Sequence, residues 1–302
     1  MSRTCLPDFL VIGAARAGTT SLYRYLKSHP QIYLSPIKEP KYFAYPETRP
    51  TLVGPRRNSP LVWKIEDYRR LFQARAGEIA AGEMSPQYLY SECAPAAIRR
   101  LIPQAKLIAI LRDPAERAFS HFCHNRSGGV EPLSDFAAAL AAEDERMAQG
   151  WWSSFHYRHR GYYARQLNRY LKLFPREQIL VLLYDDMLAD CHAFLRRICA
   201  FLGIDESHKF DTTERDNATV GIPRSPILRR FLRSAGPAKS TIRTALPLAV
   251  RSRLFRWFSR LVLQPRPVLQ PGVRAQLVSG FRPEILELQE CICRDLSGWL
   301  RC

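Results

Sequence analysis

Short apolar runs recur along the chain and are separated by longer stretches with helical spacing. Four of these runs end at Ile12, Ala81, Leu111 and Leu183. Runs of this length are typical of strands covered on both faces, and parallel sheets are built from such strands. The pattern therefore predicts an α/β fold with a mainly parallel central sheet flanked by helices.

Capping residues, helical spacing and prolines predict where the helices begin and end. One helix is expected to be capped by Thr19–Ser21 and to stop before Pro30, and another to begin at Asp113 and Pro114. The other helices are expected at 63–72, 133–148, 162–174, 191–202 and 283–299, and a short strand at 31–34.

The loop after the first strand carries Gly13, Arg16 and Gly18 and runs into Thr19–Ser21. A strand, a glycine loop and a helix start direct backbone N–H groups and the helix dipole at one point, which suits phosphate-like anions. The spacing is similar to the P-loop motif G-x-x-x-x-G-K-[ST], but Thr19 stands where that motif has lysine. Without the lysine, the loop lacks the group that reaches a γ-phosphate in P-loop kinases and NTPases. An ordinary strand–turn–helix is the alternative for this stretch alone.

A second strand–helix junction spans residues 106–120. Asp113 is a suitable N-cap, Pro114 suits the first helical position, and Glu116 completes a capping-box pattern. Capping explains neither Arg112, at the carboxyl end of the strand, nor Ser120. Ligands of open α/β sheets bind at that edge, and a guanidinium group with a hydroxyl suits an anion.

These two motifs, in this order, resemble the nucleotide-binding motifs of sulfotransferases that use 3′-phosphoadenosine 5′-phosphosulfate (PAPS). The resemblance covers residues 7–300 and is strongest to bacterial enzymes related to the heparan sulfate sulfotransferases. It implies a single P-loop NTPase-like domain over residues 1–302 that moves a sulfuryl group from PAPS to an acceptor hydroxyl, with an amine as the alternative, and that needs no metal. The residues that it assigns to PAPS are Arg16, Ala17, Gly18, Thr19, Thr20 and Ser21 at the phosphosulfate, and Arg112, Ser120 and Arg224 at the 3′-phosphate.

The same resemblance makes Glu39 the base that takes the proton from the acceptor, and Arg16 a catalytic cation beside the leaving oxygen. The alternative for Glu39 is a solvated loop residue beside Lys38 and Lys41. The family usually has lysine where this chain has Arg16 and often where it has Met84. Arginine keeps the charge of lysine with a different shape, whereas methionine cannot replace that charge.

The net charge of +17 is concentrated in residues 217–283, which hold twelve Arg, one Lys and no Asp or Glu. This segment is expected to form a lid or an acceptor-side extension. Within it, residues 246–263 form an amphipathic helix pattern that can pack on the core or lie on an anionic membrane. The chain start shows no signal-peptide core, and we expect a cytoplasmic protein, with peripheral contact at the inner membrane face as an option.

The acceptor class remains open between a glycan, a lipid and a small metabolite, and no nucleic-acid partner is expected. The aromatic segment 151–163 can line an acceptor site or pack as a helix junction. Two other functions compete with sulfuryl transfer. One is a P-loop kinase or NTPase, and the other is a non-catalytic protein of this fold that binds anions or a membrane surface.

Overall fold

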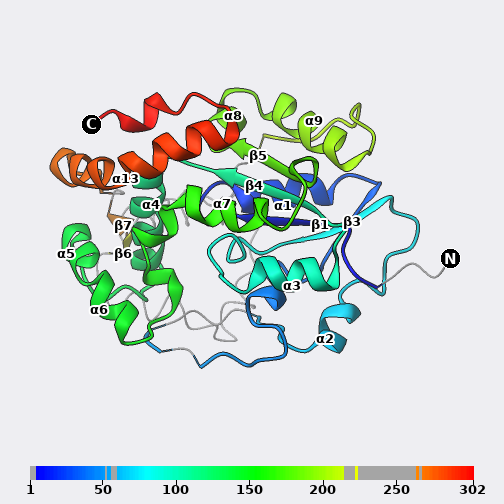
Figure 1. Ribbon diagram of the computed structural model, residues 1–302, viewed down its shortest axis with the longest axis horizontal. Coiled ribbons are helices and arrows are strands. Elements are labelled where there is room, and N and C mark those ends of the chain that lie inside the picture. The colour runs from blue at the N-terminus through cyan, green and yellow to red at the C-terminus, as the bar shows by residue number, and fades with distance from the viewer. Residues whose placement is uncertain (1–4, 52, 56–59, 214–221, 224–262, 265–266) are drawn as a thin grey trace, which may run out of the picture.

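The computed structural model describes residues 5–51, 53–55, 60–213, 222–223, 263–264 and 267–302. Its centre is a five-stranded sheet in the order β2-β3-β1-β4-β5, in which every neighbouring pair is parallel (Figure 1). The strands are β1 (Phe9–Gly13), β2 (Ile32–Leu34), β3 (Ala80–Met84), β4 (Lys106–Leu111) and β5 (Ile179–Leu183). The parallel α/β architecture predicted from the apolar runs is confirmed. β3 extends three residues beyond the expected end at Ala81.

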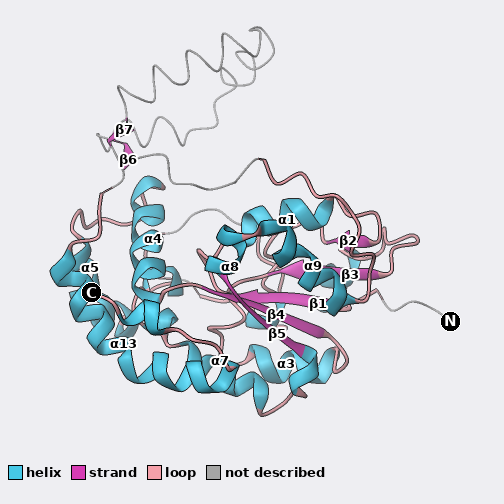
Figure 2. Ribbon diagram, turned by 90° about the horizontal axis from the view of Figure 1, so that it is seen from above, coloured by secondary structure: helices cyan, strands magenta, loops and turns pink. Residues whose placement is uncertain are grey.

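Helices cover both faces of the sheet. Figure 2 shows α1, α8 and α9 along one face and α3 and α7 along the other. The helices are α1 (Thr19–Lys27), α2 (Ile65–Arg70), α3 (Ala94–Leu101), α4 (Pro114–Ser127), α5 (Phe136–Ala141), α6 (Glu143–Ala148), α7 (Tyr163–Leu171), α8 (Tyr184–Ala189), α9 (Cys191–Leu202) and α13 (Pro271–Ile292). Shorter elements are the 3-10 turns η1 (Tyr42–Ala44), η2 (Ser153–Phe155), η3 (His159–Gly161), η4 (Arg176–Gln178) and η5 (Ser297–Leu300), and the strand pair β6 (Ile222–Pro223) and β7 (Leu263–Gln264).

The two central strands carry the two predicted anion-binding loops. β1 and β4 are neighbours, and Val11 is in register with Ile108. Both strands are almost completely buried, because helices cover the sheet on each side. The carboxyl ends of parallel strands meet at one edge, so residues 14–18 after β1 and residues 112–113 after β4 lie next to each other.

Two helix predictions were wrong in detail. α1 begins at Thr19 with Gly18 as its N-cap and without a side-chain cap, so Thr19–Ser21 do not cap it. The helix expected at 133–148 is divided into α5 and α6 around Ala142. Glu143, the first residue of α6, is fully buried and binds the backbone and ring of His159.

The start of the last helix was also predicted wrongly. α13 begins at Pro271 rather than Pro283, and Pro283 lies inside it. Proline removes a backbone hydrogen bond from a helix, so the sequence favoured Pro283 as a first residue. The buried side chains of Phe281 and Ile285 and the contacts of α13 with α7 and α4 outweigh that loss. Residues 271–283 of the basic segment therefore belong to a packed helix.

Candidate active site

The loop between β1 and α1 has a backbone that suits an anion. Gly18 has a φ of 81°, and Arg16 has a φ of 73°. A side chain at Gly18 would place Cβ 2.4 Å from Cε of Met187 on α8. Glycine is therefore needed for both conformation and space, and the N-terminal end of α1 is left uncovered by a side chain at this position.

Arg16 joins this loop to α4. Its Nε atom lies 3.4 Å from Oγ of Ser120, and its Nη1 atom lies 3.1 Å from Nδ1 of His124. Arg112 donates from Nη1 to the backbone oxygen of Arg16 over 3.2 Å. Residues from both sequence motifs, about a hundred positions apart, thus form one cluster at the edge of the sheet.

Two further groups hold Arg112 in place. Its guanidinium carbon lies 5.0 Å from the ring centre of Tyr184, and its Nη2 lies 3.6 Å from a carboxylate oxygen of Glu116. The predicted cap is confirmed, because Asp113 accepts hydrogen bonds from the N–H groups of Ala115 and Glu116. The Glu116 side chain pairs with Arg112 and with Arg274 of α13 instead of completing a capping box.

Glu39 lies beside the same loop. Nζ of Lys38 contacts Oγ1 of Thr20 at 2.8 Å and Oε1 of Glu39 at 3.2 Å, so one ammonium group links the carboxylate to α1. Both Glu39 and Lys41 have left-handed backbone conformations, with φ of 63° and 64°. Non-glycine residues rarely adopt this conformation, and such strain is concentrated at functional sites. The Glu39 side chain is 34% exposed, which leaves it accessible to an acceptor.

Lys41 is a buried cation beside Glu39, and its burial could not be predicted from the sequence. Its side chain is only 9% exposed, and Nζ lies 3.8 Å from Oε2 of Glu39 and 5.5 Å from the ring centre of Trp152. Burial lowers the pKa of Lys41, the Glu39 carboxylate opposes that change, and the charge of Arg160 adds to it. The only sequence signal was the pair of lysines that flank Glu39.

Met84 and its neighbour on β3 lie in the interior of the fold. Met84 is fully buried in the hydrophobic core. Its neighbour Glu83 is also fully buried and accepts hydrogen bonds from the hydroxyl groups of Tyr68 and Tyr88. Burial raises the pKa of Glu83 to about 7, although those hydroxyl groups oppose the change.

The aromatic segment 151–163 packs on the core, as one of the two expectations had it, and leaves Trp152 partly exposed. Phe155, Tyr157 and Tyr163 are buried in the core. Trp152 is partly exposed, stacks on Tyr45 with ring centres 6.0 Å apart, and covers Lys41 beside Glu39. This ring is therefore placed to contact an acceptor.

The structure brings together Arg16 to Ser21, Glu39, Arg112 and Ser120. Arg224 and residues 246–262 lie outside the described residues. In the described part of the chain, no group of three or more His, Cys, Asp or Glu side chains is placed to hold a metal ion. No helix in the described ranges is both long enough and apolar enough to cross a bilayer.

The comparisons with known proteins agree with this geometry. The family model described as "Sulfotransferase domain" matches residues 6–217. The chain is 30% identical over 217 residues to bifunctional heparan sulfate N-deacetylase/N-sulfotransferase 4 of Mus musculus, covering 69% of this chain and 24% of that protein. It is 28% identical over 200 residues to heparan sulfate glucosamine 3-O-sulfotransferase 3B1 of Mus musculus, covering 66% of this chain and 46% of that protein. The chain thus spans less than half the length of these two relatives.

A solved structure matches the whole chain. The sulfotransferase from Alicyclobacillus acidocaldarius has a TM-score of 0.77 and 30% identity, and the match covers 100% of both chains. The family match includes both phosphate-binding motifs and Glu39. This chain belongs to the family of PAPS-dependent sulfotransferases.

Proposed function

We propose that this chain transfers the sulfuryl group of PAPS to an acceptor hydroxyl and releases adenosine 3′,5′-bisphosphate. The observation that carries the proposal is the contact of Arg112 with the backbone of Arg16, beside Ser120. This contact places two guanidinium groups, a hydroxyl and a helix N-terminus at one edge of the sheet. Such donors fit the phosphate groups at the two ends of the nucleotide.

PAPS supplies an activated sulfuryl group whose bond to the 5′-phosphate breaks during transfer. Arg16 and the N–H groups of residues 18–20 hold the phosphosulfate and stabilise charge on the leaving oxygen. Arg112 and Ser120 hold the 3′-phosphate, and Arg224 is a further candidate for this contact. Glu39 takes the proton of the acceptor hydroxyl as its oxygen bonds to sulfur. Lys38 orients the Glu39 carboxylate toward Thr20, because its ammonium group contacts both residues.

The acceptor is proposed to carry a hydroxyl group on a carbohydrate or another polar scaffold. The names of the relatives place their own activity on heparan sulfate, which is a glycan. Trp152 supports a ring-shaped acceptor, since a partly exposed aromatic face beside Glu39 can stack on a sugar. A lipid or small metabolite with a hydroxyl group is the alternative.

The organisation and location of the protein also remain proposals. We infer one sulfotransferase domain over residues 1–302, in which residues 217–283 contribute to the acceptor side. A cytoplasmic, bacterial protein is proposed, with residues 246–263 as the part that can contact the inner membrane face. Cell fractionation with a full-length tagged protein would test this location.

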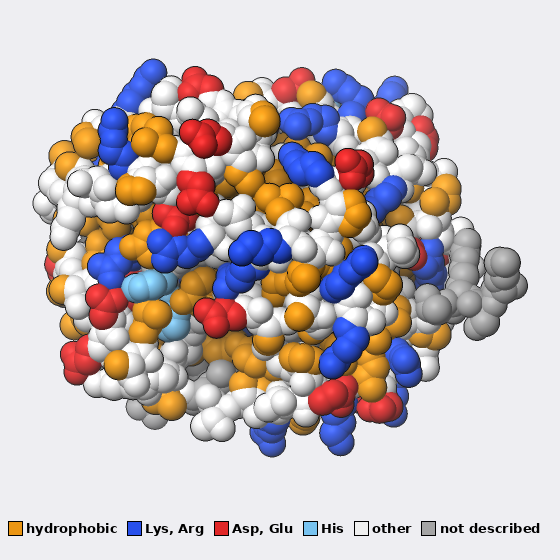
Figure 3. Space-filling view, viewed as in Figure 1, with side chains coloured by type: hydrophobic (Ala, Val, Ile, Leu, Met, Phe, Trp, Pro, Cys, Tyr) orange, Lys and Arg blue, Asp and Glu red, His pale blue; other side chains and the backbone are white. Residues whose placement is uncertain are grey.

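A P-loop kinase function and a nucleic-acid partner have less support than sulfuryl transfer. A P-loop kinase needs a loop lysine where this chain has Thr19. On the face shown in Figure 3, Lys and Arg side chains are interspersed with Asp and Glu. This mixed surface gives no support to a single nucleic-acid-binding stripe on that face.

Transfer of label from PAPS to a panel of glycan, lipid and small-molecule acceptors tests the proposal. We expect Glu39→Gln to slow transfer by roughly 10²–10⁴-fold while the affinity for adenosine 3′,5′-bisphosphate stays near that of the wild type, because the change removes a base and keeps its shape. Asp67→Asn, an exposed acidic change on α2, is the matched control. Wild-type turnover in Glu39→Gln would remove Glu39 from the mechanism.

A further inference from the structure

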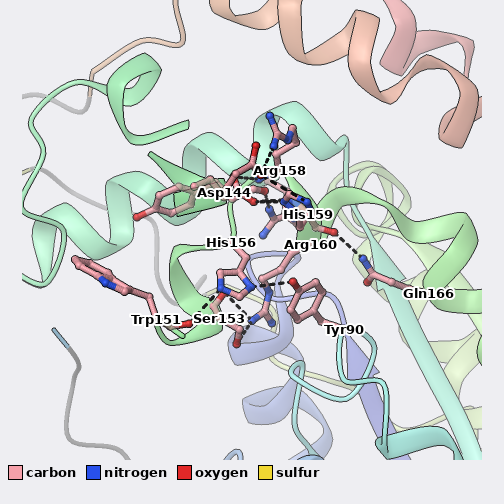
Figure 4. Close-up of polar contacts among 12 residues, drawn as sticks. Tyr90, Asp144, Trp151, Ser153, His156, Arg158, His159, Arg160 and Gln166 are labelled. Carbon is pink, nitrogen blue, oxygen red and sulfur yellow. Dashed lines mark hydrogen bonds and ion pairs between the residues drawn. The ribbon is translucent and has the colours of Figure 1, made fainter. Parts of the chain in front are cut away.

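Two arginine side chains are buried side by side next to the phosphosulfate loop. Arg117 on α4 is 0% exposed and Arg160 on η3 is 6% exposed. Arg160 donates to Oε1 of Gln87 over 2.7 Å and lies 5.3 Å from the ring centre of Tyr90. Figure 4 shows Arg160 between Tyr90 and Ser153. The two charges are close enough to act on each other, because burial and then the charge of Arg117 lower the pKa of Arg160 to about 10.

Neutral groups surround both guanidinium groups. Arg117 donates to the backbone oxygen of Tyr157 and contacts Nδ1 of His121 at 3.3 Å. Burial lowers the pKa of His121 well below its usual 6.5, so this imidazole is neutral near pH 7. Within the described residues, neither Arg117 nor Arg160 forms an ion pair with a carboxylate.

The carboxylates within electrostatic range are already used. Glu143 acts on Arg117, but its oxygens accept hydrogen bonds from the backbone of Arg158 and from the backbone and ring of His159. Glu39 acts on Arg160 and is bound by two lysines. The pair therefore has no dedicated counter-ion among the described residues.

A buried charge without a counter-ion is costly, and native structures nearly always compensate it. The Nε atom of Arg117 is completely buried and has no hydrogen-bond partner. An unsatisfied buried donor needs an explanation, and a bound ion is one that would satisfy it. Here the donor lies beside a second buried cation, so the missing partner is expected to be an anion.

A narrow pocket lies between these side chains and the phosphosulfate loop. It is lined by Ala14, Ala15, Pro86, Leu89, Tyr90, Arg117, Arg160 and Gln166. Most of this lining is buried, whereas Ala15 and Tyr90 are partly exposed. The walls lie close together, so entry of an anion requires a side-chain movement. Tyr90 is a partly exposed side chain of this lining; its hydroxyl contacts Nδ1 of His156 at 2.8 Å, and its ring packs against Arg160.

We propose that Arg117 and Arg160 form a second oxyanion site, separate from the groups that hold the nucleotide phosphates. Paired guanidinium groups favour a carboxylate, sulfate or phosphate, because their N–H donors match two oxygens at once. The pocket lining includes none of the residues assigned to the nucleotide phosphates. The oxyanion is either a group on the acceptor or a free ion.

Equilibrium dialysis with labelled inorganic sulfate tests the site. The protein is first saturated with adenosine 3′,5′-bisphosphate, so that the nucleotide phosphate contacts are filled, and ionic strength is held constant. We expect one sulfate to bind per chain and to raise the melting temperature. This readout needs no acceptor or turnover, so it can fail or succeed independently of sulfuryl transfer. Absence of sulfate binding to the nucleotide-saturated wild type would overturn the proposal without any variant.

Substitutions then locate the ion. We expect Arg160→Gln to weaken sulfate binding roughly tenfold or more, because a charge-assisted contact is lost. Arg158→Gln is the matched control, since Arg158 lies two residues away and pairs with the exposed Asp144. If Arg160→Gln does not fold, Arg160→Lys is measured in its place, because it keeps the charge and loses only the paired guanidinium donors. Sulfate affinity equal to the wild type in folded Arg160→Gln would refute the site.

Kinetics distinguish the two sources of the oxyanion. If the group belongs to the acceptor, sulfate inhibits competitively against a carboxylated or sulfated acceptor and not against PAPS. If the ion is free, labelled sulfate stays bound when that acceptor is added. Either result agrees with an oxyanion site at the Arg117 and Arg160 pair.

Discussion

Replacing Glu83 by glutamine should change how the stability of the protein depends on pH. Glu83 lies on β3 in the interior, where Tyr68 and Tyr88 donate hydrogen bonds to one of its oxygens. Its other oxygen, Oε2, is buried without a hydrogen-bond partner. The charged groups that act on it include Glu39, whose negative charge favours the protonated form. Burial is the main cause that raises its pKa from 4.5 to about 7.

The sign and size of the effect follow from this pKa. The unfolded chain loses the Glu83 proton near pH 4.5, whereas the folded protein keeps it until about pH 7. Stability from this group is therefore complete below about pH 4.5 and is lost as the pH rises through about 7. The difference between the folded and unfolded pKa values of Glu83 corresponds to about 3 kcal/mol of folding stability. Glutamine does not titrate, so the stability of Glu83→Gln should not fall with rising pH for this reason.

Urea unfolding between about pH 5 and pH 8 measures the difference. We expect the free energy of unfolding of Glu83→Gln, relative to the wild type, to increase by up to about 3 kcal/mol over this range. Burying an amide can add a constant offset, so the slope with pH is the test. Glu92→Gln is the control, because the Glu92 side chain is 92% exposed. Parallel pH profiles for the wild type and Glu83→Gln would refute this account of Glu83.

Three further substitutions test the nucleotide contact of Arg112, the conformation of Gly18 and the cap of α4. Arg112→Ala should weaken binding of adenosine 3′,5′-bisphosphate by about 1.5–3 kcal/mol and leave AMP binding much less affected, and equal losses in calorimetry would contradict its role. Gly18→Ala should destabilise the fold by about 1–2 kcal/mol or more, because Gly18 has a φ of 81° and an added Cβ would lie too close to Met187. An unchanged melting temperature would contradict the need for glycine at this position. Asp113→Ala should lower the free energy of chemical unfolding by about 1 kcal/mol, because the α4 cap is lost. The change also removes the 2.7 Å ion pair between Asp113 and Arg274. Unaltered stability would argue against the cap.

The features that depend on neighbouring residues could be predicted from the sequence. The apolar runs located the strands because buried parallel strands need continuous apolar side chains. Asp113 and Pro114 located the start of α4 because both act within one helical turn. The glycine loop and Arg112 were expected to lie together because strand ends of a parallel sheet share one edge, and Arg112 contacts the backbone of Arg16.

The features that depend on distant contacts could not be predicted. The burial of Lys41 depends on Trp152, which is more than a hundred residues away, and the Arg160 partner Gln87 is equally hidden from a local pattern. The sequence could not show that Pro283 lies inside α13, because packing on α7 outweighs the helix-breaking tendency of proline. An acidic residue within the apolar segment around Glu83 was a usable signal for a buried carboxyl group.

Calorimetric titration of the wild type with adenosine 3′,5′-bisphosphate, AMP and ATP tests the central claim most directly. The claim is that the loop of Arg16 and the strand end of Arg112 form one site that recognises both ends of the PAPS nucleotide. We expect the bisphosphate to bind roughly tenfold or more tightly than AMP, since the 3′-phosphate adds a charge-assisted contact. Equal affinity for the bisphosphate and AMP, or a preference for ATP, would contradict the account.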